Sequence, residues 1–443
     1  TLLTASNYVT DNFTTTLSTY TNYLFAEGHD LELLYNNFSN APVTTVDFTT
    51  SPLSAPRQTV VRNGGDIDYQ IESIQADYAR SFDLTKLEAG AKYTNFRNLS
   101  AVFYDDLVEG TYVRNPERSN DFDYKEKNYA LYVSLSRKFG DKLSTKAGLR
   151  YEHTDLVGVA GDGLSEENRS NYGNLFPTAY LSYRFNEKNR VNVSYSRRIN
   201  RPSFRMLSPF RWYDNPLTYG TGNPLLAPAI NNNFDLSYNF NSRLNVSLYA
   251  QLMRNGIGRI VIIEGAEKIV RAENYLDQNS YGISANLNLN PQPWLDTYVA
   301  ANAAYSTSSS AIPLVAAGSG YSFYYSINNS LSPFKNKQFK ILVNFWHQLP
   351  AERGNASRRG LSALSLGVCG PIANRLRFNF LFDDIFRQVV SRGQLFFQEY
   401  SQFYENYYDS QRINCTLSYS FGNQRAKGNR KSVKFSEKNR GGY

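Results

Sequence analysis

The stretch NYALYVSLSRKFGDKLSTKAGLRYEH, residues 128–153, decides the fold, because its apolar and polar residues alternate with a period of two. In its first half every second residue is apolar: Tyr129, Leu131, Val133 and Leu135. After the polar turn 140–142 the alternation resumes, with Leu149 and Tyr151 on one face and Arg150 on the other. Alternation over about ten residues predicts a β-strand with one apolar and one polar face. The stretch therefore predicts a β-hairpin.

The same period recurs along most of the chain. It is clear in 191–200, 243–252 and 411–421, and no segment sustains the 3.6-residue period of a helix. Counted in this way, the chain contains about 17 strands, from 11–25 to 408–421. The sequence therefore predicts an all-β fold.

The connections between these strands alternate between short and long. The short polar turns fall at 26–30, 83–86, 140–142, 186–189, 241–243, 290–293, 332–337 and 370–374. The long, irregular segments fall at 43–60, 102–123, 155–170, 201–229, 255–279, 307–319, 350–360 and 387–410. This alternation is typical of a transmembrane antiparallel β-barrel with short periplasmic turns and long extracellular loops.

The composition agrees with a membrane barrel and excludes several other classes. The 443 residues are 15% aromatic and 19% charged, with a net charge of +8, which excludes a disordered chain. No run of about 18 apolar residues exists, so no transmembrane helix is expected. The mean hydropathy of −0.48 is compatible with a barrel, whose polar inner face lowers the average.

Aromatic residues recur at the strand ends beside the short turns. Such residues form girdles at the membrane interface. The predicted periplasmic girdle contains Phe25, Phe82, Phe139, Phe185, Phe240, Trp294, Phe334 and Phe421.

The order of the short and long connections bears on the number of strands in the barrel. The first and the last visible strand both run toward the periplasm, whereas bacterial barrels have even strand numbers. We therefore expect at least one upward strand before Thr1, the alternative being a miscounted strand. The barrel is expected to occupy residues 1–422, and the basic segment 423–443 to be a disordered periplasmic tail.

Several motifs resemble one known family. The segments LFPTAYLSYRF (175–185), VNVSYSRRINRPSF (191–204), LSPF (207–210) and GNPLLAP (222–228) follow one another in a specific order. Together with LFDDIF (381–386) and the ending LSYSFG (417–422), they resemble the outer-membrane β-barrel family of TonB-dependent receptor-like proteins common in Bacteroidetes. The resemblance covers roughly 11–430. Ala229 stands where the family usually has an acidic residue.

The resemblance implies a bacterial outer-membrane protein that takes up a scarce solute. Such a barrel has about 22 strands closed around an amino-terminal plug, so this chain would begin near the sixth strand. The implied partners are outer-membrane lipid and lipopolysaccharide, the TonB complex acting through the missing plug, and a surface lipoprotein. No nucleic-acid partner is expected. The alternative is a plugless porin or a surface-binding barrel without energised transport.

Two roles are open for the charged residues on the predicted inner face: ion pairing within the barrel, or attraction of an anionic or polar solute. By register the inward charges are Lys86, Glu88, Lys92, Lys146, Arg150, Glu152, Arg184, Arg198, Arg375 and Arg377. The loop 201–229 is the strongest candidate for ligand binding, because it combines arginines with aromatics and is held by Pro turns. The aromatic segment 391–410 is a second candidate, as an extended hairpin. The candidate ligand-binding residues are Arg150, Arg198, Arg201, Arg205, Arg211, Trp212, Tyr213, Tyr219, Phe397 and Tyr404.

Catalysis and metal binding have little support in the sequence. His153 and Asp155 form the most suggestive catalytic pair, but no serine in a strained turn accompanies them. A barrel hydrolase would therefore have to lose activity on substitution of His153 by alanine. The acidic pairs Asp105–Asp106 and Asp383–Asp384 are too small to form a calcium site. We expect no enzyme activity, no metal and no cofactor.

The two cysteines are expected to stay unpaired. Counted from the end, Cys369 lies on the third strand and faces the interior, whereas Cys415 lies on the last strand and faces lipid. A strand between them and opposite orientations make a disulfide bond improbable.

Overall fold

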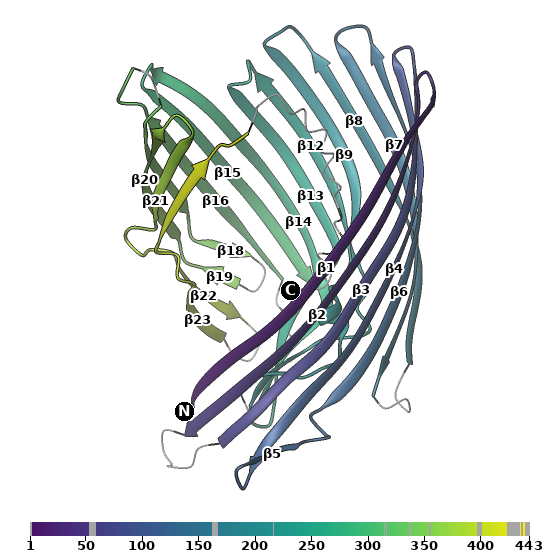
Figure 1. Ribbon diagram of the computed structural model, residues 1–443, viewed down its shortest axis with the longest axis vertical. Coiled ribbons are helices and arrows are strands. Elements are labelled where there is room, and N and C mark those ends of the chain that lie inside the picture. The colour runs from purple at the N-terminus through teal and green to yellow at the C-terminus, as the bar shows by residue number, and fades with distance from the viewer. Residues whose placement is uncertain are drawn as a thin grey trace.

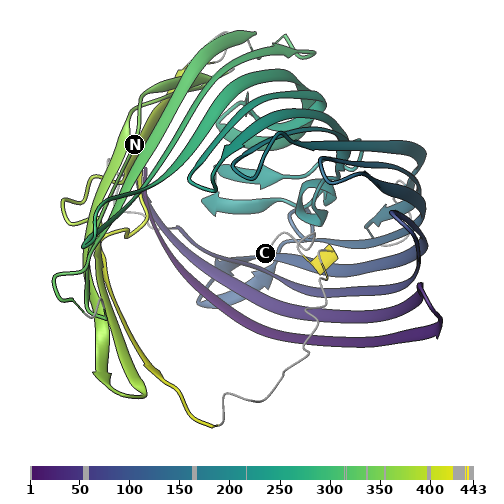
Figure 2. The same ribbon diagram turned by 90° about the horizontal axis from the view of Figure 1, so that it is seen from above.

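A computed structural model describes residues 2–52, 59–161, 167–215, 217–313, 315, 317–335, 338–353, 356–396, 401–422, 435 and 437–438. Its main feature is one large antiparallel sheet, strongly curved around an interior (Figures 1 and 2). The one helix among the described residues, α1 (Phe204–Leu207), has four residues, and no described helix is long and apolar enough to cross a membrane. The predicted all-β fold is confirmed.

The large sheet has 20 strands in the described part of the chain, and three of these are short loop strands: β5 (Thr111–Arg114), β10 (Trp212–Asn215) and β11 (Thr218–Thr221). The remaining 17 form the wall, as predicted. They are β1 (Leu2–Ala26), β2 (His29–Pro52), β3 (Thr59–Phe82), β4 (Thr85–Val108), β6 (Asn120–Phe139), β7 (Leu143–Ala160), β8 (Glu167–Arg184), β9 (Asn189–Asn200), β12 (Ala229–Phe240), β13 (Leu244–Glu264), β14 (Glu267–Gln292), β15 (Leu295–Ser310), β16 (Gly318–Leu331), β17 (Lys340–Gln348), β20 (Leu361–Ala373), β21 (Leu376–Asp383) and β24 (Arg412–Tyr419).

Each wall strand pairs antiparallel with the next one along the chain, so the topology is a continuous meander. The register of β6 with β7 extends from Phe122↔Ala160 to Phe139↔Leu143, which confirms the hairpin predicted from residues 128–153. Among the described residues, β1 and β24 are the two edges of the wall and no ladder joins them.

The two faces of the wall differ as the alternation predicts. Leu131 is 63% exposed and lies on the outer face, whereas its neighbour Ala130 is 3% exposed on the inner face. Large exposed apolar residues are expected on a surface that contacts lipid. The predicted periplasmic girdle is also exposed, at the ends of wall strands near short turns: Phe25, Phe82, Phe139, Phe185, Phe240, Trp294, Phe334 and Phe421.

Several predicted long loops are largely strand, which corrects the sequence interpretation. Residues 255–279 extend β13 and β14 up to a turn after Glu264. Residues 102–107 similarly extend β4, and 155–160 extend β7. Backbone pairing continues through these segments, although the strict apolar and polar alternation is interrupted in them. Arg375, predicted to face inward from a strand, lies in the turn between β20 and β21.

A second, four-stranded sheet contains β18 (Ala351–Arg353), β19 (Ala356–Arg358), β22 (Val390–Phe396) and β23 (Ser401–Tyr407). The pairing of β22 with β23 confirms the extended hairpin predicted within 391–410. This sheet approaches β16 closely, because a Cβ at Gly320 would lie 2.0 Å from the carbonyl oxygen of Glu352. Gly320 therefore permits contact between the two backbones.

Two described residues of the carboxyl-terminal segment contact the inner face of the wall. Phe435 is 7% exposed and packs in a cluster with Phe38 and Tyr69. Glu437 forms an ion pair with Lys92. Residues 423–434, 436 and 439–443 lie outside the described residues, so the expected disordered periplasmic tail stays a prediction.

Both cysteine orientations agree with the register. Cys369 on β20 and Cys415 on β24 are free and are separated by β21. Thiol labelling of the protein, unfolded without reductant, is therefore expected to modify both residues. Labelling of neither residue would contradict the register of the last three wall strands.

Candidate ligand site

The loop between β9 and β12, residues 201–228, folds into the interior of the wall (Figure 2). We call it the inner loop; its residue 216 is not among those described. It contains α1 and the hairpin of β10 with β11. β11 pairs parallel with β14 from Thr218↔Lys268 to Thr221↔Arg271. β11 can pair with this part of β14 because β15 does not: the pairing of β14 with β15 starts only at Leu276↔Ser310.

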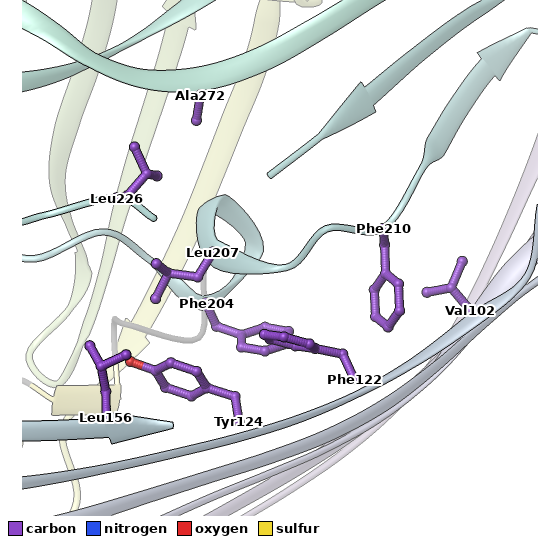
Figure 3. Packing of buried hydrophobic residues seen from close by; sticks show 9 residues of the cluster. All are labelled: Val102, Phe122, Tyr124, Leu156, Phe204, Leu207, Phe210, Leu226 and Ala272. Atoms are coloured by element: carbon purple, nitrogen blue, oxygen red, sulfur yellow. The ribbon is translucent and has the colours of Figure 1, made fainter. Parts of the chain in front are cut away.

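Apolar packing fixes the inner loop against two sides of the wall. Its residues Phe204, Leu207, Phe210 and Leu226 are all at most 5% exposed. Figure 3 shows them against residues of β4, β6, β7 and β14, namely Val102, Phe122, Tyr124, Leu156 and Ala272. Burial of side chains of this size stabilises by about 1.5–3 kcal/mol each. The inner loop is therefore a packed element that crosses the interior.

A second apolar cluster contains two residues predicted to bind ligand. Tyr213 and Tyr219 are each 4% exposed. They pack with residues of β2, β3, β4 and β14, namely Val46, Phe48, Val61, Tyr104 and Ile269. Arg211 lies over the Tyr219 ring at 5.0 Å from its centroid. The structure therefore places Tyr213 and Tyr219 in the packing of the inner loop, and their role in ligand binding stays a prediction.

Backbone hydrogen bonds close the inner loop at the GNP motif. Gly222 N–H donates to the carbonyl of Ser208 at 2.9 Å, and Asn223 N–H donates to that of Met206 at 2.6 Å. The Asn223 amide also donates to Glu273 of β14 at 2.8 Å. Residues that carry the family resemblance therefore hold the ends of the loop together.

An ion-pair network anchors the start of the inner loop. Arg201 Nη2 lies 2.6 Å from Glu152 Oε2, and Arg150 Nε lies 2.5 Å from Glu152 Oε1. The Arg201 and Glu152 side chains are only 14% and 11% exposed. Burial opposes the charged form of Arg201, but the carboxylate of Glu152 raises its pKa above the usual value. Arg201 is therefore a charged structural anchor of the inner loop, and its role in ligand binding stays a prediction.

A cavity of about 470 Å³ separates the inner loop from β13 and β14. Arg205 and Trp212 from the loop and Arg259 from β13 line it, together with Asp214. Arg205 lies 5.4 Å from the centroid of the Trp212 ring. Within the described chain neither Arg205 nor Arg259 has a carboxylate within 4.0 Å, and the buried Trp212 Nε1 has no acceptor. Two guanidinium groups and an indole N–H can thus bind an anion.

The other predicted ligand residues lie elsewhere. Arg150 and Arg198 line a second cavity, of about 440 Å³, on the inner face of β6–β9. Tyr404 lines a third, of about 360 Å³, between the inner face and the four-stranded sheet. Phe397 lies outside the described residues. Those predicted residues that the structure describes are therefore distributed among three cavities and two packed regions.

Sequence reasoning missed Arg259. It falls in 255–279, which was predicted to be a loop, whereas the structure places it on β13 opposite Ala272. Arg259 and Arg205 line the same cavity only because the inner loop folds into the interior. The Arg residue in an otherwise apolar stretch, Ile257–Ile263, was the available signal.

Half of the inward charges predicted on the wall form ion pairs with each other, namely Lys86, Glu88, Lys146, Arg150 and Glu152. Glu88 lies 2.6 Å from both Lys86 and Lys146. The Arg184 guanidinium donates to the carbonyl of Asp141 at 2.8 Å. These contacts favour the structural role for this group.

The weak catalytic and metal candidates have ordinary environments. His153 Nε2 lies 3.2 Å from Asp155 Oδ1, on the outer face of β7. Asp105 binds Arg114, and Asp384 accepts hydrogen bonds from two backbone N–H groups and Ser410. The described residues contain no group of three or more His, Cys, Asp or Glu arranged to hold a metal ion.

The fold is shared with solved structures of outer-membrane receptors. The copper transporter OprC superposes with a TM-score of 0.59 at 10% identity, over 95% of this chain and 76% of OprC. The ferric yersiniabactin uptake receptor FyuA from Yersinia pestis gives 0.55 at 12% identity, over 89% of this chain and 61% of FyuA. FpvA of P. aeruginosa, solved with pyoverdines, gives 0.60 at 14% identity, over 91% of this chain and 55% of FpvA.

The chain thus spans just over half to three quarters of the lengths of these neighbours. No curated protein sequence matches it. The family model of the outer membrane protein beta-barrel family matches residues 24–419, which is most of the wall. The chain therefore belongs to the outer membrane protein beta-barrel family, and its location is the bacterial outer membrane.

Proposed function

We propose that the protein is an outer-membrane receptor that takes up a scarce anionic solute in a TonB-dependent manner. Its family and its fold support a receptor or transporter kind of function. Among the neighbours, OprC is a copper transporter, FyuA is an uptake receptor for ferric yersiniabactin, and FpvA was solved with bound pyoverdines. The solute proposed for this chain rests instead on its own cavity.

The observation that carries the proposal is the cavity lined by Arg205, Arg259 and Trp212. Both guanidinium groups are without an ion-pair partner among the described residues, and one lies near an aromatic ring. Free cations in a partly enclosed site select anions, because charge-assisted hydrogen bonds strengthen away from bulk water. Asp214, which also lines the cavity, disfavours a simple polyanion and favours a solute that also has a hydrogen-bond donor.

The two cations come from different parts of the fold. Arg205 belongs to α1 of the inner loop, and Arg259 belongs to wall strand β13. A bound anion therefore connects the loop to the wall. A displacement of the loop would separate the two cations and weaken the site, which gives energised transport a way to release the solute.

Replacing both Arg205 and Arg259 by glutamine is expected to weaken anion binding at least about tenfold, because each charged hydrogen bond contributes about 1.5–3 kcal/mol. Isothermal titration of the purified protein with citrate measures the effect, with maltohexaose as an uncharged probe. The matched control is Arg254→Gln, which removes an outer-face arginine that is already near Asp277.

Two results would contradict the proposal. Equal citrate affinity in the double variant and the control would exclude the cavity as the anion site. Citrate accumulation that persists in cells lacking TonB, together with a steady open conductance in planar bilayers, would favour the porin alternative.

A further inference from the structure

Two residues near the carboxyl terminus, Phe435 and Glu437, contact the inner face of the wall. The sequence around them is basic: residues 423–443 contain seven Lys or Arg. Phe435 is the one phenylalanine of this segment, and Glu437 has its one side-chain carboxylate. The two residues that differ most from the basic composition of the segment are therefore residues that bind the wall. Figure 2 shows the carboxyl-terminal end within the curve of the wall, next to the inner loop.

Three neighbouring wall strands provide the apolar site for Phe435. We call it the docking cluster; it contains Phe38 of β2, Ile67, Tyr69 and Ile71 of β3, and Phe96 of β4. Phe435 is 7% exposed there, and its ring meets that of Phe38 edge-on, with centroids 6.4 Å apart and planes at 73°. Apolar burial and edge-to-face ring contacts do not depend on charge. The cluster can therefore hold a segment whose net charge is strongly positive.

An ion pair adds a specific polar contact. Glu437 pairs with Lys92 of β4, and these side chains are 19% and 14% exposed. The neighbouring carboxylates on the inner face have other partners. Asp77 accepts a hydrogen bond from the Gln75 amide at 2.7 Å, and Glu88 lies 2.6 Å from each of two other lysines. The charge of Lys92 is thus compensated by Glu437, in a partly enclosed place where such pairs are stronger than in water.

The docking cluster also contacts the inner loop. Trp212 of β10 packs against this cluster, and it packs against the cluster formed by Phe204, Leu207 and Phe210 of the inner loop. Its ring lies close to β3, because a Cβ at Gly65 would lie 3.4 Å from it. One aromatic side chain therefore connects the site of Phe435 with the core of the inner loop.

We propose that the carboxyl-terminal segment is a tethered ligand of the barrel interior, which docks through Phe435 and Glu437 on the inner face of β2–β4 and stabilises the inner loop through Trp212. Phe435 provides the apolar contact, and Glu437 sets the position along β4. The docked segment occupies part of the interior beside the inner loop. Its release would remove part of the cluster on which Trp212 packs. The docking does not depend on which solute the barrel takes up.

The test is cleavage of the full-length protein by endoproteinase Glu-C, which can cut after Glu437 only when its carboxylate is free. Intact mass spectrometry measures the loss of residues 438–443. We expect this loss to be at least about tenfold slower than in a synthetic peptide of residues 429–443, because proteolysis follows the population of the open form. Phe435→Ala is expected to be cut at least about tenfold faster than the unchanged protein, since it loses a buried aromatic side chain.

Variants of Lys92 separate specific docking from general attraction. Lys92→Gln is expected to accelerate the cleavage about fivefold, whereas Lys92→Arg keeps the charge and should stay slow. The matched control is Lys86→Gln, on the same strand and face, because Lys86 pairs with Glu88. Its cleavage rate is expected to equal that of the unchanged protein.

Acrylamide quenching of Trp212 fluorescence tests the contact with the inner loop. Trp212 is observed alone after replacing Trp294 and Trp346, the other two tryptophans, by phenylalanine. In this background Phe435→Ala is expected to increase the quenching of Trp212, because part of its packing surface is lost. Lys86→Gln is expected to leave the quenching unchanged.

Three outcomes would overturn the proposal. Cleavage after Glu437 could be as fast in the unchanged protein as in the free peptide, which would show that the segment is not docked. Lys86→Gln could accelerate cleavage as much as Lys92→Gln, which would indicate a general electrostatic effect of the inner face. Phe435→Ala could be cut faster while the quenching of Trp212 stays the same, which would separate the segment from the inner loop. Heat-modifiable migration on gels shows that each variant is folded.

Discussion

Replacing Arg201 by alanine is expected to lower the free energy of unfolding by about 3–5 kcal/mol, because it removes one of the two cations that compensate the buried carboxylate of Glu152. Glu152 is 9% exposed and Glu126 is 1% exposed. Arg201 lies 2.6 Å from the first and 4.0 Å from the second, and it also donates to Thr154 at 3.1 Å. Arg150 remains beside Glu152 in this variant.

The measurement is equilibrium unfolding in urea, in detergent micelles, with the slope compared between variants. Arg169→Ala is the control, because Arg169 forms a pair with Glu167 at 2.6 Å on an exposed surface and such pairs contribute little. Adding Glu152→Gln to Arg201→Ala should recover part of the loss, since it removes a buried carboxylate that has lost one of its two cations. A loss in Arg201→Ala no larger than in Arg169→Ala would contradict the anchoring role of Arg201.

The anchoring role of Arg201 could not be predicted from the sequence. An arginine in a loop rich in aromatics and Pro turns has the composition of a ligand site, and Arg201 was predicted as one. Composition does not show whether a loop projects into solvent or folds inward. Here Phe204, Leu207 and Phe210 are the apolar residues that bring the loop inside.

The wall itself was largely predictable. The period of two predicts each strand, and the short turns predict which strands pair. The aromatic residues at the strand ends predict where the membrane interface lies. The extensions of β6 and β7 were not predicted, because Asp123, Lys125 and Asp155 make the outer face polar there. Backbone pairing needs no apolar residue, so strands can continue into water after the hydrophobic signal has ended.

The cavity of Arg205 and Arg259 depends on contacts between distant parts of the chain. The inner loop meets β14 through a parallel pairing, Tyr219↔Ile269, that no local pattern predicts. The register of β13 with β14 then sets the position of Arg259. Each guanidinium is visible in the sequence, but their shared cavity exists only once both pairings are formed.

The folded inner loop leads to the second large effect. Replacing Gly222 by alanine is expected to release the loop from the interior, because a Cβ there would lie 2.3 Å from the Ser208 carbonyl oxygen and 2.5 Å from that of Met206. Both oxygens accept backbone hydrogen bonds that close the loop. The backbone therefore cannot move aside without losing those bonds, and unsatisfied buried groups cost about 1–3 kcal/mol each.

Limited digestion with trypsin measures the release, because Arg205 and Arg211 lie in the inner loop. Cleavage at these residues is expected to be slow in the unchanged protein and at least about tenfold faster in Gly222→Ala, since proteolysis follows the population of the open form. Planar bilayers should record a larger conductance for the variant if the displaced loop leaves the interior less obstructed.

Gly220→Ala is the matched control in the same loop. A Cβ at Gly220 would meet its nearest atom, the Val270 carbonyl oxygen, at 3.8 Å, which is an ordinary contact. The two variants add the same methyl group two residues apart, so they differ in the space available and not in chain entropy or helix propensity. Faster cleavage in both variants would mean that any added side chain loosens β11. Slow cleavage in both would show that the carbonyl groups of Ser208 and Met206 can move aside to accommodate the added methyl group. Only fast cleavage confined to Gly222→Ala supports a loop whose inward fold depends on the close approach of its two ends.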